Sequence, residues 1–258
     1  MPNKQNERLR DALRGKGMTP AELAAKIDVD VKTVERWITK GRPPYPKHRY
    51  SVAALLSQSE NYLWPNALKD DRKALVSESE IVHIYPRRNS VPPELWRRLF
   101  NEASEHIDVL AFGGVFPFDH DPTLIKELEQ KAVKGLEARL LVGDPSSKAV
   151  ALRGIEEGIG GAMTARVANT LAHFDNLKGT PRVEVRSHAT ALYNSIYRFD
   201  REMLVNTHVW GFPAAHNPVV HLRQLSGGTM FDLYRQSFER VWATGNDIWA
   251  NGAKNDSN

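Results

Sequence analysis

Three polar residues of the stretch LYNSIYRFD, residues 192–200, have types and a spacing that could perform chemistry. Tyr193, Ser195 and Asp200 stand at positions i, i+2 and i+7, which is a spacing that phosphoryl chemistry uses. The apolar residues between them are also typical of an ordinary half-buried strand, because successive side chains of a strand point to opposite faces. The stretch therefore admits both a functional site and a purely structural strand.

Other polar residues fall near the expected ends of neighbouring strands, where arginines suit an anionic ligand such as a nucleotide or another phosphate compound. With the three residues above, the candidate ligand-binding residues are Arg139, Asp144, Arg153, Glu157, Arg186, His188, Asn206 and His208, and Glu156 adjoins them. Each could instead be a salt-bridged structural residue. The two histidines could hold a metal with Asp144 or Asp200, but no helix-spaced ligand pair supports this. We expect no metal and no cofactor.

The elements that must position these residues begin at Glu94, where apolar strands alternate with amphipathic helices. Helices are expected at 93–104, 122–135, 147–157, 161–177 and 229–242, and strands at 106–114, 136–144, 182–188, 191–200, 202–211 and 219–225. This pattern predicts an α/β domain at 94–250 with a mixed, largely parallel sheet covered by helices. We expect residues 251–258 to be a disordered tail.

The polar, proline-punctuated residues 66–93 predict a linker that contains the domain boundary. A tether is the simplest role for this segment. Its residues Tyr85, Arg87 and Arg88 could instead line a pocket of the following domain.

Residues 1–65 predict an all-α domain with helices at 6–14, 20–27, 31–40 and 51–64. Leu9 and Leu13 are four residues apart, which places both on one helix face. Thr19 and Glu22 have the spacing of a capping box, with proline at the first helical position between them. Asp30 is placed to cap the third helix.

Positive charge is concentrated in this first domain. Residues 1–50 hold 12 Lys and Arg against 6 Asp and Glu, a net of +6, whereas the rest of the chain has a net charge of −2. A short helix, a tight turn and a helix with polar outward residues follow the helix-turn-helix plan, in which the second helix lies in the DNA major groove. A three-helix module that docks another protein would show the same core pattern.

Under the helix-turn-helix interpretation, the candidate DNA-binding residues are Thr19, Lys32, Thr33, Glu35, Arg36, Thr39, Lys40, Arg42, Lys47 and Arg49. Arg36 suits pairing with guanine, and Glu35 suits cytosine. The basic residues from position 40 onward suit phosphates, which supply affinity rather than sequence choice.

The stretch MTPAELAAKIDVDVKTVERWITKGR resembles the Xre-type helix-turn-helix family. The resemblance places Leu23 and Ala24 below the turn and Thr33 and Val34 in the recognition helix. Family members often carry Gln where Pro20 stands, and Gly where Asp28 stands. The resemblance implies sequence-specific binding to a double-stranded DNA operator.

The stretch LIKELEQKAVKGLEARLLVGD is similar to the first half of phospholipase D-like domains. Their signature is His-x-Lys-x4-Asp, and here Tyr193 occupies the His position, Ser195 the Lys position, and Asp200 matches. IYPRRNSVPPELW, LLVGDPSSKAVALRGIEEGIG, LYNSIYRFD and VNTHVWG together resemble a domain found behind Xre-type units in actinobacterial regulators. Chains with a single motif of this kind usually form homodimers.

Tyrosine is a poor replacement for the nucleophilic histidine because its ordinary pKa of about 10 leaves little phenolate at neutral pH. Serine supplies no positive charge to a phosphate. We therefore expect no enzyme activity, but a regulator whose second domain dimerises and senses a small anionic effector. The alternatives are a DNA-directed nuclease or phosphodiesterase and a protein-interaction module.

Apolar runs, the first residues and the cysteine content indicate where the protein is located. No apolar run approaches the roughly 18–20 residues that span a bilayer, and the start MPNKQNERLR lacks the apolar core of a signal peptide. Cysteine is absent, which fits a reducing interior. We expect a cytoplasmic protein without a membrane partner.

Overall fold

The computed structural model describes residues 5–65, 67, 79–113, 115, 118, 121 and 123–250. The chain divides into two compact units, which are considered separately. The first comprises the residues up to Glu80 together with Gln224–Asp232, and the second comprises Ile81–Arg223 and the residues from Leu233 onward. The tail expected at 251–258 and residues 66 and 68–78 of the linker expected at 66–93 lie outside the described residues. No helix in the described ranges is long and apolar enough to cross a membrane.

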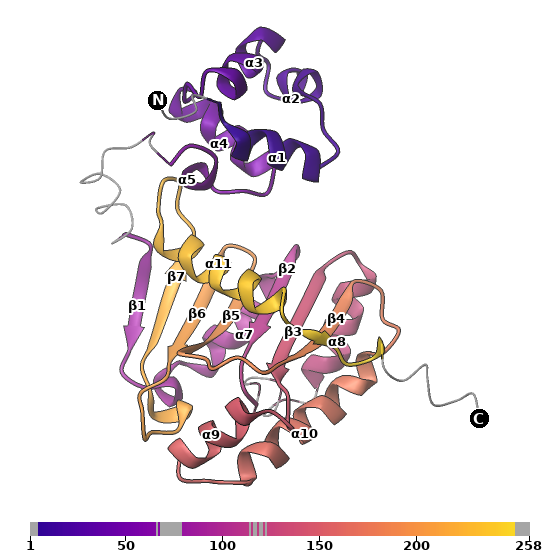
Figure 1. The fold of residues 1–258 in the computed structure, drawn as a ribbon, viewed down its shortest axis with the longest axis vertical. Coiled ribbons are helices and arrows are strands. Elements are labelled where there is room, and N and C mark those ends of the chain that lie inside the picture. The colour runs from indigo at the N-terminus through magenta and orange to yellow at the C-terminus, as the bar shows by residue number, and fades with distance from the viewer. Residues whose placement is uncertain are drawn as a thin grey trace. The chain divides into compact units, whose positions relative to one another are not determined.

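The first unit contains five labelled helices in its described part (Figure 1). They are α1 (Glu7–Gly15), α2 (Pro20–Lys26), α3 (Val31–Thr39), α4 (Pro46–Leu55) and α5 (Glu60–Leu63). The predicted inner-face residues Leu9 and Leu13 are buried, and they belong to one apolar core with Val34, Val52 and Leu63.

Local hydrogen bonds start α2 and α3 where the sequence predicts. The hydroxyl of Thr19 accepts from the backbone N–H of Glu22 at 3.2 Å, and the Glu22 carboxylate accepts from the Thr19 N–H at 2.8 Å, which confirms the capping box. Asp30 accepts from the N–H of Lys32 at 2.7 Å. Between the helices Asp28 has a φ of 55°, a left-handed conformation that aspartate tolerates better than most residues.

The helix predicted at 51–64 is wrong in its extent. α4 begins at Pro46, because proline is well suited to the first turn of a helix, and it ends at Leu55. Ser57 then takes a φ of 50°, and the hydroxyl of Ser59 caps the short α5.

The second unit is built on an eight-stranded sheet in the order β1-β7-β6-β5-β2-β3-β4-β8. Its strands are β1 (Ile81–Tyr85), β2 (His106–Leu110), β3 (Glu137–Gly143), β4 (Val183–His188), β5 (Asn194–Phe199), β6 (Glu202–Thr207), β7 (Val219–Arg223) and β8 (Asn246–Asp247). Its helices are α7 (Pro93–Glu102), α8 (Thr123–Val133), α9 (Lys148–Glu156), α10 (Ala162–Phe174) and α11 (Met230–Trp242), and η1 (Arg88–Ser90), η2 (Asp175–Leu177) and η3 (Ala214–His216) are 3-10 turns.

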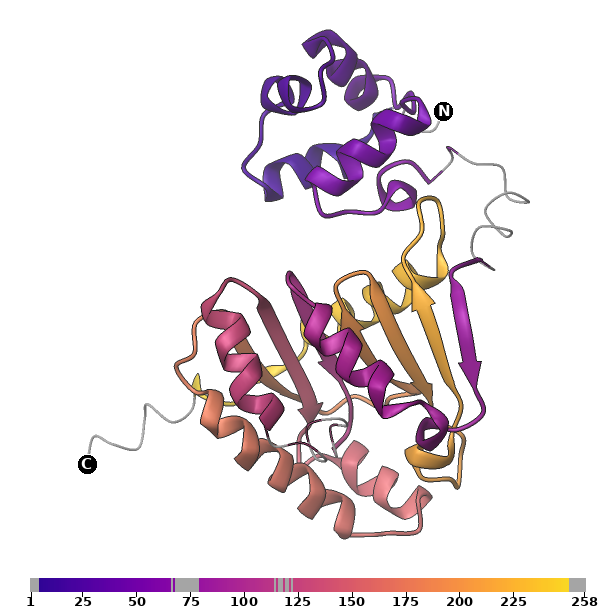
Figure 2. The ribbon, with the colours of Figure 1, turned by 180° about the vertical axis from the view of Figure 1, so that it is seen from behind.

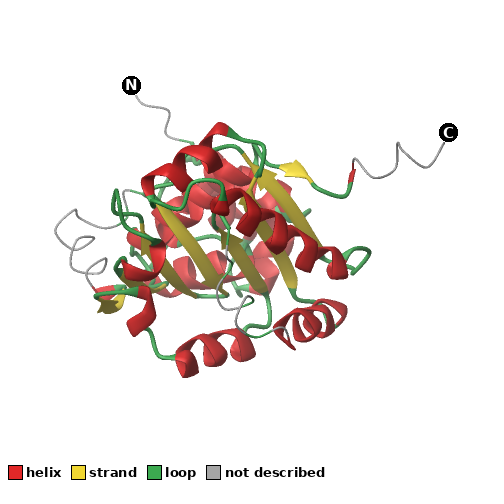
Figure 3. Cartoon of the chain, turned by 90° about the horizontal axis from the view of Figure 1, so that it is seen from below, coloured by secondary structure: helices red, strands yellow, loops and turns green. Residues whose placement is uncertain are grey.

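Helices cover both faces of this sheet. α11 crosses one face of the sheet (Figure 1), whereas α7 and α8 lie on the other face, which Figure 2 shows from the front. Figure 3 shows the yellow strands between red helices. The core under α7 includes Trp96 and Tyr197, whose rings meet edge to face at 5.1 Å. The prediction of an α/β domain with a helix-covered mixed sheet is confirmed for the described residues.

The prediction that the sheet is largely parallel is wrong. Among the described strands, only the β2–β3 and β3–β4 pairs are parallel. The β5–β6 pair is antiparallel because only Asp200 and Arg201 connect its strands, and a parallel pair needs a crossover of a dozen or more residues. Residues 81–85, which the sequence assigned to the linker, form β1 and pair with β7.

Candidate functional site

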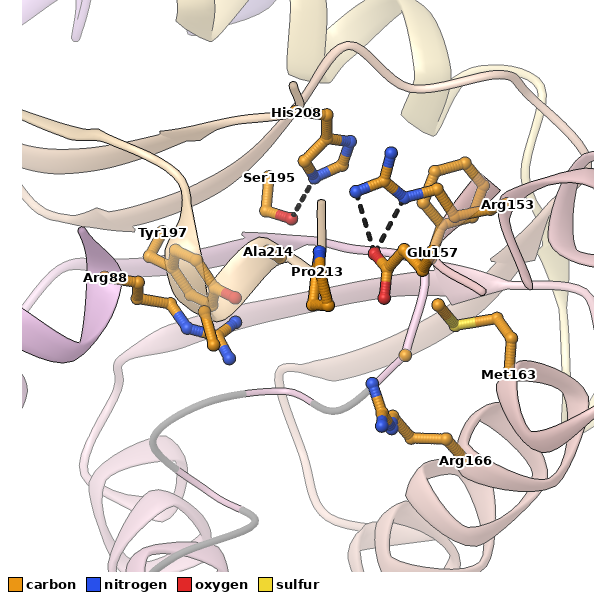
Figure 4. Close-up of a pocket in the computed structure, with 13 residues that line it drawn as sticks. Arg88, Arg153, Glu157, Met163, Arg166, Ser195, Tyr197, His208, Pro213 and Ala214 are labelled. Atoms are coloured by element: carbon orange, nitrogen blue, oxygen red, sulfur yellow. Dashed lines mark hydrogen bonds and ion pairs between the residues drawn. The ribbon is translucent and has the colours of Figure 1, made fainter. Parts of the chain in front are cut away.

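A cavity of about 320 Å³ lies in the second unit, where β5 and the end of β6 approach α9 and α10 (Figure 4). The side chains with polar groups that line it are Arg88, Arg153, Glu157, Arg166, Ser195, Tyr197 and His208. Its apolar walls include Phe112, Met163 and Pro213. Four of the predicted ligand-binding residues, Arg153, Glu157, Ser195 and His208, are therefore brought together.

Ser195 and His208 form a hydrogen-bonded pair in one wall of the cavity. Nδ1 of His208 lies 3.2 Å from the carbonyl oxygen of Leu192, which can only accept, so Nδ1 carries the hydrogen of the neutral ring. Nε2 then accepts from the Ser195 hydroxyl at 3.1 Å. The backbone N–H of His208 also donates to the Tyr193 carbonyl, which fixes the chain beside β5.

The surroundings of His208 keep its ring neutral. Burial lowers the pKa of His208 most, and the positive charge of Arg153 lowers it further, to about 4. The hydrogen bond to Leu192 acts in the opposite direction but is outweighed. At neutral pH the ring therefore acts as an acceptor toward Ser195.

A buried ion pair joins Arg153 to Glu157. Two guanidinium nitrogens of Arg153 each lie 2.8 Å from Oε1 of Glu157, and both side chains are nearly inaccessible to solvent. Arg153 also contacts Glu156 at 3.4 Å and donates to the carbonyl of Phe212 at 3.3 Å. The other carboxylate oxygen of Glu157, Oε2, accepts no hydrogen bond from the described residues and points away from Arg153 in Figure 4.

Two further arginines enter the cavity from other elements (Figure 4). Arg166 extends from α10, and its guanidinium forms no hydrogen bond or ion pair with the described part of the chain. Arg88 extends from η1, whose backbone is held by the hydrogen bond from the Arg88 N–H to the Asn217 carbonyl.

Three predicted members of the site lie elsewhere. The side chain of Tyr193 is outside the cavity and 84% exposed. The carboxylate of Asp200 accepts from the N–H groups of Ser104, Glu105 and His106, at the far end of β5. The amide of Asn206 is buried and donates to backbone carbonyls before β7.

The remaining four candidates are held by local structural contacts and do not line the cavity. Arg139 pairs with Asp108 and Glu239 on the face covered by α11. The guanidinium of Arg186 lies 4.2 Å from the centre of the Trp242 ring.

The other two lie near the ends of β3 and β4. Asp144 accepts from the Ser146 N–H, and Nε2 of His188 lies 3.1 Å from the Ala111 carbonyl. In the described ranges no three His, Asp or Glu side chains are grouped to hold a metal.

Sequence reasoning missed Arg166, Phe112 and Met163, whereas it considered Arg88 as one of the linker residues that could line a pocket. No local signal identifies these residues, because their place depends on how α10 and η1 pack around the sheet. An arginine on an exposed helix face is equally typical of a solvated surface.

The predicted DNA-contacting residues of the first unit are mostly exposed. Exposed residues of α3, the following loop and the start of α4 are Lys32, Glu35, Arg36, Thr39, Lys40, Arg42 and Lys47. Thr33 is half-buried, and Thr19 is occupied in the capping box. Arg49 differs from the other predicted DNA-contacting residues, since its side chain is buried and donates to Glu60 at 3.1 Å.

No protein-family model and no curated protein sequence matches the chain. Similar solved structures include TrmBL2, an archaeal chromatin protein described as showing a novel mode of DNA binding, with a TM-score of 0.41, 13% identity, and coverage of 78% of this chain and 62% of that one. This chain thus spans less than two thirds of the archaeal protein. Another is the phospholipase D family member Nuc from Salmonella typhimurium, with a TM-score of 0.35, 13% identity, and coverage of 60% and 93%.

Proposed function

We propose that this protein is a sequence-specific DNA-binding transcriptional regulator of the Xre type, and that α3 is its recognition helix. The proposal rests on how the basic side chains of the first unit are bonded. The basic residues of α3, the loop after it and the start of α4, which are Lys32, Arg36, Lys40, Arg42 and Lys47, form no side-chain hydrogen bond or ion pair with the described residues.

Basic residues on α1 have partners within the unit. Arg10 lies 2.8 Å from Glu7, Arg14 lies 3.8 Å from Asp11, and Arg8 donates to the carbonyl of Tyr62. The exposed cations of α3 are thus available to an external polyanion, whereas the opposite face of α3 is buried through Val34. Phosphate contacts by such residues supply affinity, and base contacts supply specificity.

The first experiment is selection of bound duplexes from a randomised DNA pool by the full chain. We expect enrichment of a defined sequence, which a protein-docking module would not produce. The matched control is an Arg10→Ala variant, whose altered residue is paired on α1 and should leave the selected sequence unchanged. A pool that remains random after repeated rounds would contradict the proposal.

We also propose that the second unit binds a small ligand with an anionic group in the cavity. The guanidinium groups of Arg88 and Arg166 support this proposal, because planar guanidinium groups bind carboxylates and phosphates with two parallel hydrogen bonds. Isothermal titration of the full chain with inorganic phosphate, nucleotides and carboxylates is the test. The proposal predicts that Arg166→Gln weakens any binding that is found.

We propose further that this unit is not a phosphodiesterase. Tyr193, at the position expected for a nucleophile, is exposed and outside the cavity, and no lysine lines the cavity among the described residues. A phosphate there would have neither the nucleophile nor the ammonium group of the expected chemistry.

The hydrolytic alternative has one observation in its favour, which is the Ser195–His208 hydrogen bond. A hydroxyl beside an oriented imidazole is a typical pair of nucleophile and base. The low pKa of His208 makes the ring a weak base. Hydrolysis of bis-p-nitrophenyl phosphate by the full chain, lost in Ser195→Ala, would favour the enzyme.

We propose, finally, that the protein acts as a cytoplasmic homodimer, which would place two copies of α3 on successive major grooves. Exposed apolar residues in the second unit support a contact between copies, since Trp210 and Phe212 are 78% and 56% exposed. The bond from Arg153 to the Phe212 carbonyl places this loop beside α9, where Ile155 is also exposed. Light scattering of Trp210→Ala should show a shift toward monomer, and a monomeric native chain would contradict the dimer.

A further inference from the structure

One carboxylate oxygen of Glu157 is open to a hydrogen-bond donor in the cavity. Oε1 of Glu157 accepts from Arg153, but Oε2 receives no hydrogen bond from the described residues. Glu157 is only 9% exposed, and Figure 4 shows Oε2 on the side away from Arg153 among the cavity-lining groups. A carboxylate oxygen that faces a cavity can accept a hydrogen bond from an ammonium group, and such charge-assisted hydrogen bonds are stronger than neutral ones.

The hydroxyl oxygen of Ser195, like Oε2 of Glu157, offers a hydrogen-bond acceptor to the cavity. Its hydrogen is directed to Nε2 of His208, because Nδ1 of that ring already donates to the Leu192 carbonyl. The lone pairs of the hydroxyl oxygen remain, so Ser195 can accept a hydrogen bond from a ligand. Ser195 and Glu157 together give the cavity an accepting region.

Arg166 gives the cavity a donating region of opposite charge. It extends from α10 and is not a partner of Glu157. Arg153 does not add to this region, because Glu157 and Glu156 already neutralise it. The cavity thus combines an arginine that suits an anion with a carboxylate that disfavours one.

From this combination we infer that the cavity binds a small zwitterion, a molecule with a carboxylate or phosphate group and an ammonium group, such as a free amino acid. The anionic group would lie against Arg166, and the ammonium group would donate to Glu157 and Ser195. The inference rests on the proposed ligand-binding function and narrows its ligand class. A ligand with anionic oxygens alone would leave Oε2 of Glu157 facing a like charge.

The size and walls of the cavity are compatible with this class. Its volume of about 320 Å³ is at the lower end of the range typical of small-molecule sites. Phe112, Met163 and Pro213 offer apolar surface to a side chain. A small zwitterion with an apolar substituent would therefore use both kinds of lining.

The test is isothermal titration of the full chain with the twenty free amino acids, and with inorganic phosphate and adenosine monophosphate as probes that lack an ammonium group. We expect at least one amino acid to bind. Its N-acetyl derivative, which lacks the ammonium group, should bind at least about tenfold more weakly. Arg166→Gln should also weaken the binding of the free amino acid. Arg240→Gln, on α11, is the matched control and should leave that binding unchanged.

Substitution of Glu157 locates the ammonium contact. Glu157→Gln should weaken the affinity for the amino acid at least about tenfold. The matched Glu156→Gln should leave that affinity within about twofold of the native value, because Glu156 does not line the cavity. Circular dichroism would show whether Glu157→Gln is folded. Ser195→Ala removes an acceptor without removing a charge, and it should weaken the same ligand severalfold if the first variant fails to fold.

The outcomes separate the two proposals. If phosphate or the nucleotide binds in an Arg166-dependent manner, no amino acid binds, and Glu157→Gln binds the anion as tightly or more tightly, the zwitterion inference is overturned while anion binding stands. If none of the probes binds, the inference is overturned and the ligand-binding proposal falls with it.

Discussion

Nε2 of His208 accepts the hydroxyl hydrogen of Ser195 across 3.1 Å, and this bond determines what both residues can offer to the cavity. The opposite ring nitrogen donates to the Leu192 carbonyl, so the neutral ring has a single arrangement of its hydrogen. Protonation of His208 would place a second hydrogen on Nε2, and the serine would have to turn its own hydrogen away. The wall of the cavity therefore changes polarity with the charge of one histidine.

The stability of the protein should depend on pH through His208. Its folded-state pKa of about 4 lies below the value of 6.5 expected in the unfolded chain, so the unfolded state binds more protons between these values. The free energy of unfolding should be fully maintained above the unfolded pKa and fall as pH drops toward 4, with a slope of up to ~1.4 kcal/mol per pH unit. Urea denaturation at a series of pH values measures this slope.

A His208→Gln variant isolates this contribution. Burial also lowers the pKa of His188, His221 and His106, so these histidines add to the slope in both proteins. The variant should show a shallower loss of stability than the native chain over the same range. Equal slopes would mean that His208 is protonated as readily when folded as when unfolded.

Arg49 should contribute to stability rather than to DNA contact. It donates to Glu60 at 3.1 Å and to the Pro44 carbonyl at 3.0 Å, and Glu60 also accepts from the hydroxyl of Ser226. Arg49→Met should lower the free energy of unfolding by about 3 kcal/mol, because it leaves a buried carboxylate without its cation. Arg42→Met, at an exposed position, is the control and should change it by less than about 0.5 kcal/mol.

Asp200 should also have a structural role. Its carboxylate accepts from the N–H groups of Ser104, Glu105 and His106, and its own φ is 49°. Asp200→Ala should lower the free energy of unfolding by about 2 kcal/mol, because charged hydrogen bonds are lost and alanine is strained at this φ. Asp200→Asn should cost less, since asparagine keeps one accepting oxygen and tolerates the conformation. A loss of ligand binding in folded Asp200→Ala would contradict this role.

Lys47 should supply affinity for DNA without supplying specificity. It is exposed at the start of α4 and forms no side-chain contact with the described residues. Lys47→Ala should weaken binding to all duplexes alike and reduce the slope of log affinity against log salt by about 1, the loss of one phosphate contact. Fluorescence anisotropy over a range of salt concentrations measures the slope. An unchanged slope would remove Lys47 from the interface.

The elements that the sequence predicted well are those held by local interactions. The Thr19–Glu22 capping box and the Asp30 cap involve residues two or three positions apart, so their chemistry is visible in the chain itself. The helices and strands from residue 93 onward follow from hydrophobic periodicity for the same reason. The observed elements are shorter than predicted, most clearly β2, which ends at Leu110 where the sequence predicted a strand to 114.

The features that sequence reasoning missed depend on distant pairing. The β1 strand has the apolar sequence IVHIY, but its partner β7 is more than a hundred residues away. Arg49 resembles a surface arginine until Glu60 is placed beside it. Arg166 enters the cavity only because α10 packs across the end of the sheet, and Arg139 is removed from it by Asp108 and Glu239.

The reading of DNA by α3 is tested most directly by the ratio of affinities for the selected duplex and for the same duplex with the guanine opposite Arg36 replaced. Fluorescence anisotropy should show the native chain preferring the selected duplex by at least about tenfold, the discrimination typical of one bidentate base contact. Arg36→Ala should reduce this ratio to near unity, whereas Lys47→Ala should preserve it while lowering both affinities. An Arg36→Ala variant that discriminates as well as the native chain would contradict the assignment of α3 as the recognition helix.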